Sequence, residues 1–257
     1  MRQQITKMKK IVILISLSLF ANLSNSAFSI TPEEIVKRVD NLLRGKSNIM
    51  TMQMIVTTPD WTRENTMKSW SLGTDKAFVK ILSPAKDKDT RFLKLEYNLW
   101  MFIPKVEKVI KIPPVMMMES FMGSDFSYDD MVKESSIVKD YVPHLVDRDT
   151  IEQEENYVLE LVPKPDAPVI YGKLKLWVRT KDLIPTREEY YNEKKEIIKV
   201  MIFKDIIKVG DRFIPTYWEM TNLKKKDHKT IIRIQEAQFN IKIKPSIFTK
   251  RNLSRIG

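Results

Sequence analysis

The 257-residue sequence has no cysteine, only two histidines and only six glycines. Without cysteine there is no disulfide, no thiolate metal site and no cysteine nucleophile, so burial of apolar side chains must hold the fold together. His144 and His228 lack the spacing of a metal site and have no carboxylate cluster beside them. The few glycines form no phosphate-binding loop, and no Gly-x-Ser-x-Gly motif occurs. These absences argue against an enzyme, and we expect no metal and no cofactor.

The N-terminus has the pattern of a secretory signal peptide. Four basic residues between positions 2 and 10 precede an apolar run at positions 11–23, and small residues up to Ala27 follow. We predict that residues 1–27 are a cleaved signal peptide and that residues 28–257 form a single domain. The apolar run is short for a membrane span, which disfavours the alternative of an uncleaved anchor. No cysteine follows the run, so lipid attachment there is not expected and the exported protein should be soluble.

The formal charge is basic throughout. It is +11 for the whole sequence and falls to +7 when residues 1–27, with four basic and no acidic side chains, are removed. Basic surfaces favour anionic partners, and for an exported protein these are phospholipid headgroups or membrane surfaces rather than nucleic acid. Solubility alone is an adequate explanation, and we prefer it. The basic run Lys224–Lys226 lies in a predicted hairpin turn without interleaved aromatic residues, so no nucleic-acid partner is expected.

Periodicity predicts one helix followed by many strands. Thr31, Pro32 and Glu34 have the pattern of a capped helix start, and an apolar stripe at helical spacing then runs to Gly45. Beyond it, alternating segments are separated by short hydrophilic turns, which is typical of hairpins rather than of parallel crossovers. We predict a mainly β (α+β) fold with an antiparallel sheet of about eleven strands and few helices. Such a sheet tends to curl, and helices or a ligand must fill its concave face.

The most informative segment runs from Asn98 to Met131. Residues 99–103 are apolar on both faces of a predicted strand, and a polar turn leads to a second strand that ends at two prolines. Residues 115–122 then have the composition of a short apolar helix, with Gly123 as its end. Methionines in this helix are flexible and polarisable, so they can repack around irregular apolar partners. Two interpretations are open on these residues alone: a plug in the core, or a lid that contacts a ligand.

Three carboxylates follow this methionine run. Asp125, Asp129 and Asp130 could form a catalytic pair or a cation site, but their spacing lacks the regularity of a calcium loop. Ser127 is a good N-cap, and it places Asp129 and Asp130 in the first turn of a helix through Val132. We prefer this capping role.

Three motifs resemble the LolA-like family of outer-membrane lipoprotein-sorting proteins. Residues 99–104 (LWMFIP) are similar to the family's tryptophan-aromatic-proline strand, and residues 247–253 (IFTKRNL) are similar to its C-terminal ending. The most specific match is residues 120–130 (SFMGSDFSYDD). The resemblance extends from the predicted helix at Thr31 to Leu253.

The resemblance implies an unclosed half-barrel of about eleven antiparallel strands around a few helices, as in LolA and LolB. It implies an apolar cavity that receives acyl chains, in a protein of the periplasm. Carriers of this family take lipoproteins from an inner-membrane transporter to an outer-membrane acceptor. The motifs resemble a branch that is associated with resistance-nodulation-division (RND) type permeases, so an ABC-type or an RND-type transporter is the implied partner. The cargo stays open between a lipoprotein, a phospholipid and another lipid.

These observations lead to the hypothesis of a non-enzymatic periplasmic carrier of acyl chains that contributes to outer-membrane biogenesis and contacts membranes at most peripherally. Burial is worth about 0.8 kcal/mol per methylene, so a sixteen-carbon chain could gain roughly 12 kcal/mol before ordering costs. The predicted lipid-binding residues are Met50, Met52, Met54, Trp70, Val79, Leu93, Leu95, Trp100 and Phe102 in the cavity, and Met117, Met118, Phe121 and Met122 over it. A one-residue error in strand phase would exchange inner and outer faces. The alternative is an accessory or sensor subunit of an RND-type complex; a hydrolase would need a nucleophile and base that the sequence does not offer.

Overall fold

The structure is a computed structural model that describes residues 30–133 and 137–255. The predicted signal peptide at residues 1–27 and the predicted cleavage site lie outside the described residues. Residues Pro32–Gly257 form a compact unit. No helix within the described ranges has the length and apolar character needed to cross a membrane.

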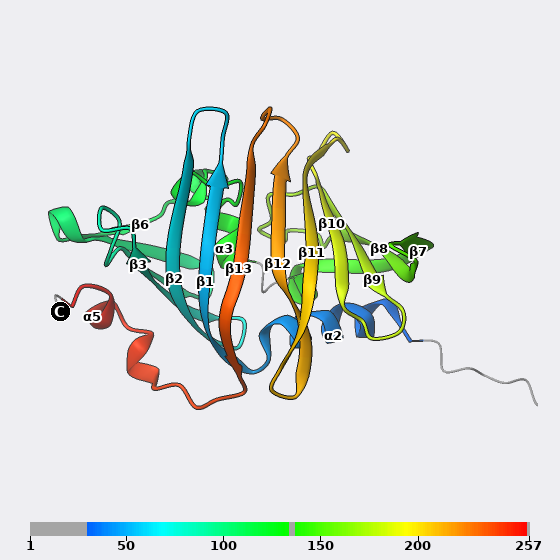
Figure 1. Cartoon of the computed structure of the whole chain (residues 1–257), viewed down its shortest axis with the longest axis horizontal. Coiled ribbons are helices and arrows are strands. Elements are labelled where there is room, and N and C mark those ends of the chain that lie inside the picture. The colour runs from blue at the N-terminus through cyan, green and yellow to red at the C-terminus, as the bar shows by residue number, and fades with distance from the viewer. Residues whose placement is uncertain (1–29, 134–136, 256–257) are drawn as a thin grey trace, which may run out of the picture. The chain divides into compact units, whose positions relative to one another are not determined.

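The main element is one antiparallel sheet of thirteen strands (Figure 1). Its order is β6-β5-β4-β3-β2-β1-β13-β12-β11-β10-β9-β8-β7, so hairpins run outward from a central pair formed by the first and last strands. The strands are β1 (Ser47–Thr57), β2 (Thr62–Leu72), β3 (Lys76–Ser83), β4 (Arg91–Leu95), β5 (Asn98–Ile103), β6 (Lys108–Lys111), β7 (Tyr141–Ile151), β8 (Glu154–Pro163), β9 (Lys173–Arg179), β10 (Pro185–Tyr191), β11 (Ile197–Val209), β12 (Arg212–Asn222) and β13 (Lys229–Phe239).

The sheet is open, because its edge strands β6 and β7 do not pair with each other. The predicted mainly β, antiparallel architecture is confirmed, whereas the predicted total of about eleven strands is too low. The segments expected as strands correspond to the thirteen observed, with one difference at residues 137–140. These form helix α4 (Ile137–Asp140), and the strand expected from Ile137 begins at Tyr141.

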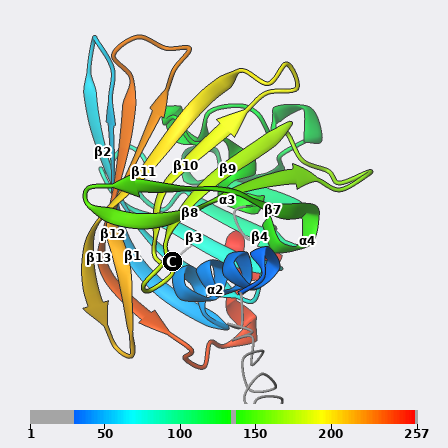
Figure 2. The ribbon, with the colours of Figure 1, turned by 90° about the vertical axis from the view of Figure 1, so that its right-hand side faces the viewer.

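The connection between the two edges of the sheet explains the segment that the sequence singled out. Because β6 and β7 are opposite edges, the chain must cross the sheet between Lys111 and Tyr141. We call residues 112–133 the crossing segment; it contains the 3-10 turns η2 (Pro114–Met116) and η3 (Phe121–Gly123) and helix α3 (Tyr128–Lys133). Figure 2 shows α3 and α4 on the same side of the central strands as helix α2 (Pro32–Arg44).

The helix predicted at residues 115–122 is not formed. Backbone amides that a helix would use are paired across a small antiparallel bridge instead: Phe121 N donates to Phe126 O (2.7 Å) and Tyr128 N donates to Glu119 O (3.0 Å). Met122 has left-handed dihedrals (φ 52°, ψ 31°), which break any continuous helix there. The prolines therefore start a 3-10 turn, not a helix.

Helix α2 forms where the capping pattern predicted it. Ile35, Val36 and Val39 are its buried residues, and they follow the predicted apolar stripe. The helix ends at Gly45, whose N–H donates to Asn41 O (2.8 Å) and whose φ is +66°. A Cβ atom at Gly45 would lie only 2.8 Å from Asn240 Oδ1, so glycine is required there for both conformation and space.

We expect Gly45→Ala to lower the free energy of unfolding by about 1–2 kcal/mol, because alanine is strained at positive φ and would also displace Asn240. Gly210→Ala is the matched control, since Gly210 has φ +62° but no atom within 4 Å of the added Cβ. Urea denaturation of both variants should show the larger loss for Gly45→Ala. Equal losses would mean that the contact with Asn240 contributes nothing.

The sheet buries apolar side chains on both faces. One face, turned towards α2 and the crossing segment, carries Met54, Met67 and Met201, all nearly inaccessible. On the other face, a second core joins the strands to the C-terminal segment, which contains the 3-10 turn η4 (Pro245–Ile247) and helix α5 (Lys250–Leu253). Its buried members are Phe78, Leu93, Phe102, Ile243, Phe248 and Leu253.

Candidate functional site

A deep cavity opens on the face of the sheet that carries α2. It is lined by side chains from α2, α4, the crossing segment, and strands β1–β4, β7 and β9–β13. Because strands from both flanks contribute to one cavity, the sheet must curl around it. The apolar wall includes Met50, Met52, Met54, Met67, Leu174, Leu176, Met201, Phe203, Trp218 and Ile232.

Methionine dominates the centre of this wall. Three of the five methionines project from alternate positions of β1, one from β2 and one from β11. Unbranched thioether side chains adapt to apolar ligands of variable shape, and they offer no strong hydrogen bond. The wall is therefore suited to a flexible apolar chain rather than to a rigid polar molecule.

Four of the predicted cavity residues line the cavity. Met50, Met52 and Met54 are 6%, 8% and 0% exposed and form the β1 row, and Val79 lies on the same face two strands away, on β3. Their side chains share one face because they occupy alternate positions that are in register through β2. The methionine alternation in the sequence was a correct guide to the inner face of β1.

The other five predicted cavity residues lie on the opposite face of the sheet. Leu93 and Phe102 belong to the second core, and three more pack against it: Trp70, Leu95 and Trp100. The placement of these five in the cavity is therefore corrected. The error is a one-residue phase slip: in β2, for example, Trp70 packs against the second core, whereas its neighbours Ser69 and Ser71 line the cavity.

The predicted cover residues separate into buried and exposed positions. Phe121 is 1% exposed and Met117 is 8% exposed, whereas Met118 is 63% exposed and Met122 is half-buried. None of the four is in the cavity wall, where the crossing segment contributes Phe126, Asp129 and Asp130 instead. The crossing segment thus borders the cavity through residues that lie after the methionine run.

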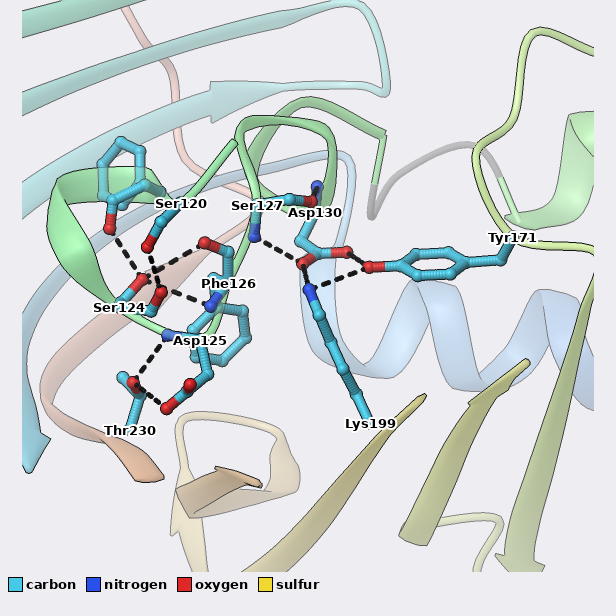
Figure 3. Close-up of polar contacts among 10 residues, drawn as sticks. Ser120, Ser124, Asp125, Phe126, Ser127, Asp130, Tyr171, Lys199 and Thr230 are labelled. Carbon is cyan, nitrogen blue, oxygen red and sulfur yellow. Dashed lines mark hydrogen bonds and ion pairs between the residues drawn. The ribbon is translucent and has the colours of Figure 1, made fainter. Parts of the chain in front are cut away.

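One anchor of the crossing segment joins it to the centre of the sheet (Figure 3). The backbone N–H of Asp125 donates to Thr230 Oγ1 (2.8 Å), and the Thr230 hydroxyl donates to Asp125 Oδ2 (2.9 Å). Thr230 lies on β13 and is fully buried. Asp125 is therefore a structural residue, but it does not cap a helix as expected.

A second anchor is a buried ionic group. Ser127 Oγ accepts from Asp130 N (3.1 Å) and Asp130 Oδ2 accepts from Ser127 N (2.6 Å), which is the reciprocal pattern of a capping box. The predicted capping role is thus observed for Ser127 and Asp130. The Asp130 carboxylate also accepts from Lys199 Nζ (3.0 Å) and from the Tyr171 hydroxyl (2.6 Å), and both partners lie on the far flank of the sheet (Figure 3).

The electrostatics of this group keep Tyr171 protonated. Burial raises the pKa of Tyr171 well above its ordinary value, and the adjacent Asp130 carboxylate raises it further. Lys199 also donates to the Tyr171 oxygen (3.1 Å). Asp130, Lys199 and Tyr171 are therefore bonded to one another. This is a structural hydrogen-bond network rather than an acid–base pair for catalysis.

Aromatic packing forms a third anchor. The ring of Phe121 lies 4.8 Å from that of Phe92 on β4 and 5.8 Å from that of Tyr128. Arg63, from β2, donates to the carbonyl of Met122. Gly123 follows with φ +77°, and a Cβ there would meet the Arg63 guanidinium at 2.8 Å. The segment thus crosses the sheet under restraint from strands of both flanks.

The sequence of this chain matches one protein family. A family model described as "Uncharacterized protein" matches residues 73–255. The chain belongs to this family. No curated protein matches the chain.

Solved structures show which fold this family member has. It is similar to a DUF1329 family protein from Desulfovibrio piger (TM-score 0.80, 20% identity, covering 86% of this chain and 97% of that one). It is also similar to a putative outer membrane lipoprotein-sorting protein domain from Vibrio parahaemolyticus (TM-score 0.77, 22% identity, covering 87% of this chain and 98% of that one). A third similar structure is a LolA superfamily protein from Nitrosomonas europaea (TM-score 0.76, 22% identity, covering 87% of this chain and 100% of that one). The family member therefore has the LolA-like fold, as the sequence motifs indicated.

Several wall residues of this family member were not found from the sequence. Met67 was missed although it lies between the polar residues Thr66 and Lys68, the same alternation as in β1. Met201 lies between Val200 and Ile202, so alternation could not identify it. Lys199 and Tyr171 could not be found this way, because they lie far from Asp130 in the sequence and nothing local marks them as its partners.

Proposed function

We propose that this protein is a periplasmic, non-enzymatic carrier that binds the acyl chains of lipoproteins or lipids in the cavity. The observation that supports this most is the methionine wall, which combines apolar character with adaptability. Asp125 and Asp130 of the crossing segment are bonded to Thr230, Lys199 and Tyr171, so we assign these two carboxylates to structure rather than to catalysis. Met50, Met52, Met54 and Val79 contact the acyl chain, together with Met67 and Met201.

The proposal includes a route for the cargo. Residues 1–27 direct export as a cleaved signal peptide, and residues 28–257 act as a single lipid-binding domain in the periplasm. An inner-membrane transporter of the ABC or RND type supplies the lipid, and an outer-membrane acceptor receives it. Support comes from the fold, since two proteins that share it are named for lipoprotein sorting or for the LolA superfamily.

Native mass spectrometry of the protein purified from its host tests the central claim. We expect a co-purifying lipid whose mass identifies the cargo class. Delipidated protein should take up a fluorescent fatty acid such as cis-parinaric acid, with saturation at one or a few sites. Repeated absence of both bound lipid and fatty-acid uptake would contradict carriage and favour a role as an accessory or sensor subunit of a transport complex.

We expect Val79→Trp to weaken fatty-acid uptake about tenfold or more, because the larger side chain fills space that the acyl chain would occupy. Lys80→Trp is the matched control: Lys80 is the next residue of β3, so its side chain points to the other face of the sheet. Titration of cis-parinaric acid measures both variants. Equal affinity of Val79→Trp and the unmodified protein would place the acyl chain elsewhere.

A further inference from the structure

The free edge of the sheet at β6, together with the first part of the crossing segment, exposes a concentration of apolar side chains. Six of the eighteen large apolar side chains that are exposed among the described residues fall between positions 106 and 118: Val106, Val109, Ile110, Val115, Met116 and Met118. Val115 is 84% exposed, more than any other in that set. Single exposed apolar residues are ordinary on protein surfaces, but such a concentration marks an interaction surface.

The ordered backbone around the turn η2 keeps the side chains of Val115, Met116 and Met118 exposed to solvent. Pro113 and Pro114 restrict the chain, and the turn η2 is closed by Met116 N donating to Pro113 O (2.9 Å). The buried residue Met117 fixes the turn, since Asp129 N donates to Met117 O (2.8 Å). Its neighbours Met116 and Met118 are exposed on either side, so the apolar surface is presented without the entropic cost of ordering a loose loop.

Basic residues lie beside this apolar surface, with one acidic residue, Glu107, among them. Lys105 and Lys108 are exposed beside Val106 and Val109 on the β5–β6 hairpin. Within the same hairpin, the ammonium group of Lys111 lies 5.8 Å from the centre of the half-buried Trp100 ring, and that of Lys250, from α5, lies 4.5 Å from it. A tryptophan with flanking lysines next to exposed aliphatic residues is the combination that favours a lipid–water interface.

We propose that this surface, which we call the edge patch (Val106, Val109, Ile110, Val115, Met116 and Met118, with Lys105 and Lys108), binds the surface of a membrane containing anionic phospholipids. The apolar side chains enter the region between headgroups and acyl chains, and the lysines contact phosphates. Lys108 and Lys111, at the two ends of β6, argue against a protein strand as the partner, because lysine on an edge strand disfavours edge-to-edge pairing. The inference does not depend on occupancy of the cavity.

Co-sedimentation of the protein without residues 1–27 with vesicles of phosphatidylglycerol and phosphatidylcholine tests the edge patch. We expect binding to mixed vesicles, weak binding to pure phosphatidylcholine, and a decrease in affinity of about tenfold or more for Lys105→Glu with Lys108→Glu. The matched control is Lys225→Glu with Lys226→Glu, an equal charge change on exposed lysines of the β12–β13 turn. It should leave binding nearly unchanged.

A second pair of variants tests the apolar side chains of the edge patch. Val115→Asp with Met118→Asp should abolish vesicle binding, whereas Ile207→Asp with Phe213→Asp, at positions 49% and 54% exposed on β11 and β12, should retain it. All four residues are exposed, so circular dichroism should show folded proteins. Val79→Trp should bind vesicles normally, which separates this inference from the proposed acyl-chain cavity.

Either of two results would overturn the proposal. One is absence of vesicle binding, or binding that falls equally in the patch variants and their controls. The other is a change in oligomeric state, measured by light scattering, that accompanies the patch variants while vesicle binding stays constant, because the edge patch would then be a contact between protein chains.

Discussion

Replacing Asp130 with alanine should lower the free energy of unfolding by about 3–5 kcal/mol, since the change leaves a buried lysine without its counter-charge. The side chains of Lys199 and Asp130 are 11% and 8% exposed, so water cannot replace the lost partner efficiently. The same substitution removes the acceptor for the Tyr171 hydroxyl and the cap on the backbone N–H of Ser127. Urea denaturation followed by tryptophan fluorescence measures the change.

Asp75→Ala is the control for this prediction. The ion pair between Asp75 and Lys139 has a similar length (2.9 Å), but its side chains are 56% and 50% exposed, so its loss should change stability by at most about 1 kcal/mol. Combining Asp130→Ala with Lys199→Met should cost about 0.5–3 kcal/mol less than the sum of the two single changes, because the unpaired charge is removed. Strict additivity would show that the two groups do not interact in the folded protein.

The sequence alone predicted those elements that have one buried face and one less buried face. The α2 stripe and the β1 methionine row each alternate between a buried and a less buried side, so periodicity identifies the inner face. Hydrophilic turns between long strands indicate hairpins, which correctly predicts an antiparallel sheet. Each segment predicted as a strand contains an observed strand, although the one expected from Ile137 begins at Tyr141 and the total of about eleven was too low.

Strand phase failed where both faces of the sheet are buried. In β4 the four consecutive buried positions include both Phe92 and Leu93, and in β5 apolar residues occupy both faces of the strand. Alternation then carries no information, and a one-residue slip cannot be detected. The missing signal lay in the C-terminal segment, where Ile243, Phe248 and Leu253 form the apolar layer that covers the second face. Treating that segment as a layer would have assigned Trp70 and Leu93 to it.

The structure of the crossing segment could not be predicted from its sequence, for a different reason. Its composition left a core plug and a lid as alternatives, and its structure includes parts of both: Phe121 and Phe126 are buried, whereas Val115 and Met118 face solvent. The decision depends on the separation of β6 and β7 to opposite edges, which no local pattern contains. Of the methionines that suggested a cover over the cavity, Met117 is buried and Met122 is half-buried, whereas Met118 is exposed and belongs to the edge patch.

Phe121→Ala should cost about 3–5 kcal/mol of stability, because it removes a ring that is 1% exposed and packed against Phe92 and Tyr128. The cavity left behind would lie between the crossing segment and β4, two elements that the curled sheet holds in place, so collapse around it is restricted. We expect the midpoint of urea denaturation to fall markedly, with the slope of the transition unchanged.

Met118→Ala is the matched control for Phe121→Ala, three residues earlier in the same segment. Its side chain is 63% exposed, so its truncation should alter stability by no more than about 0.5 kcal/mol. The pair distinguishes a segment packed into the core from a mobile lid. If Phe121→Ala were as mild as Met118→Ala, the crossing segment would be detached from the sheet in solution, and its three anchors would not hold it over the concave face.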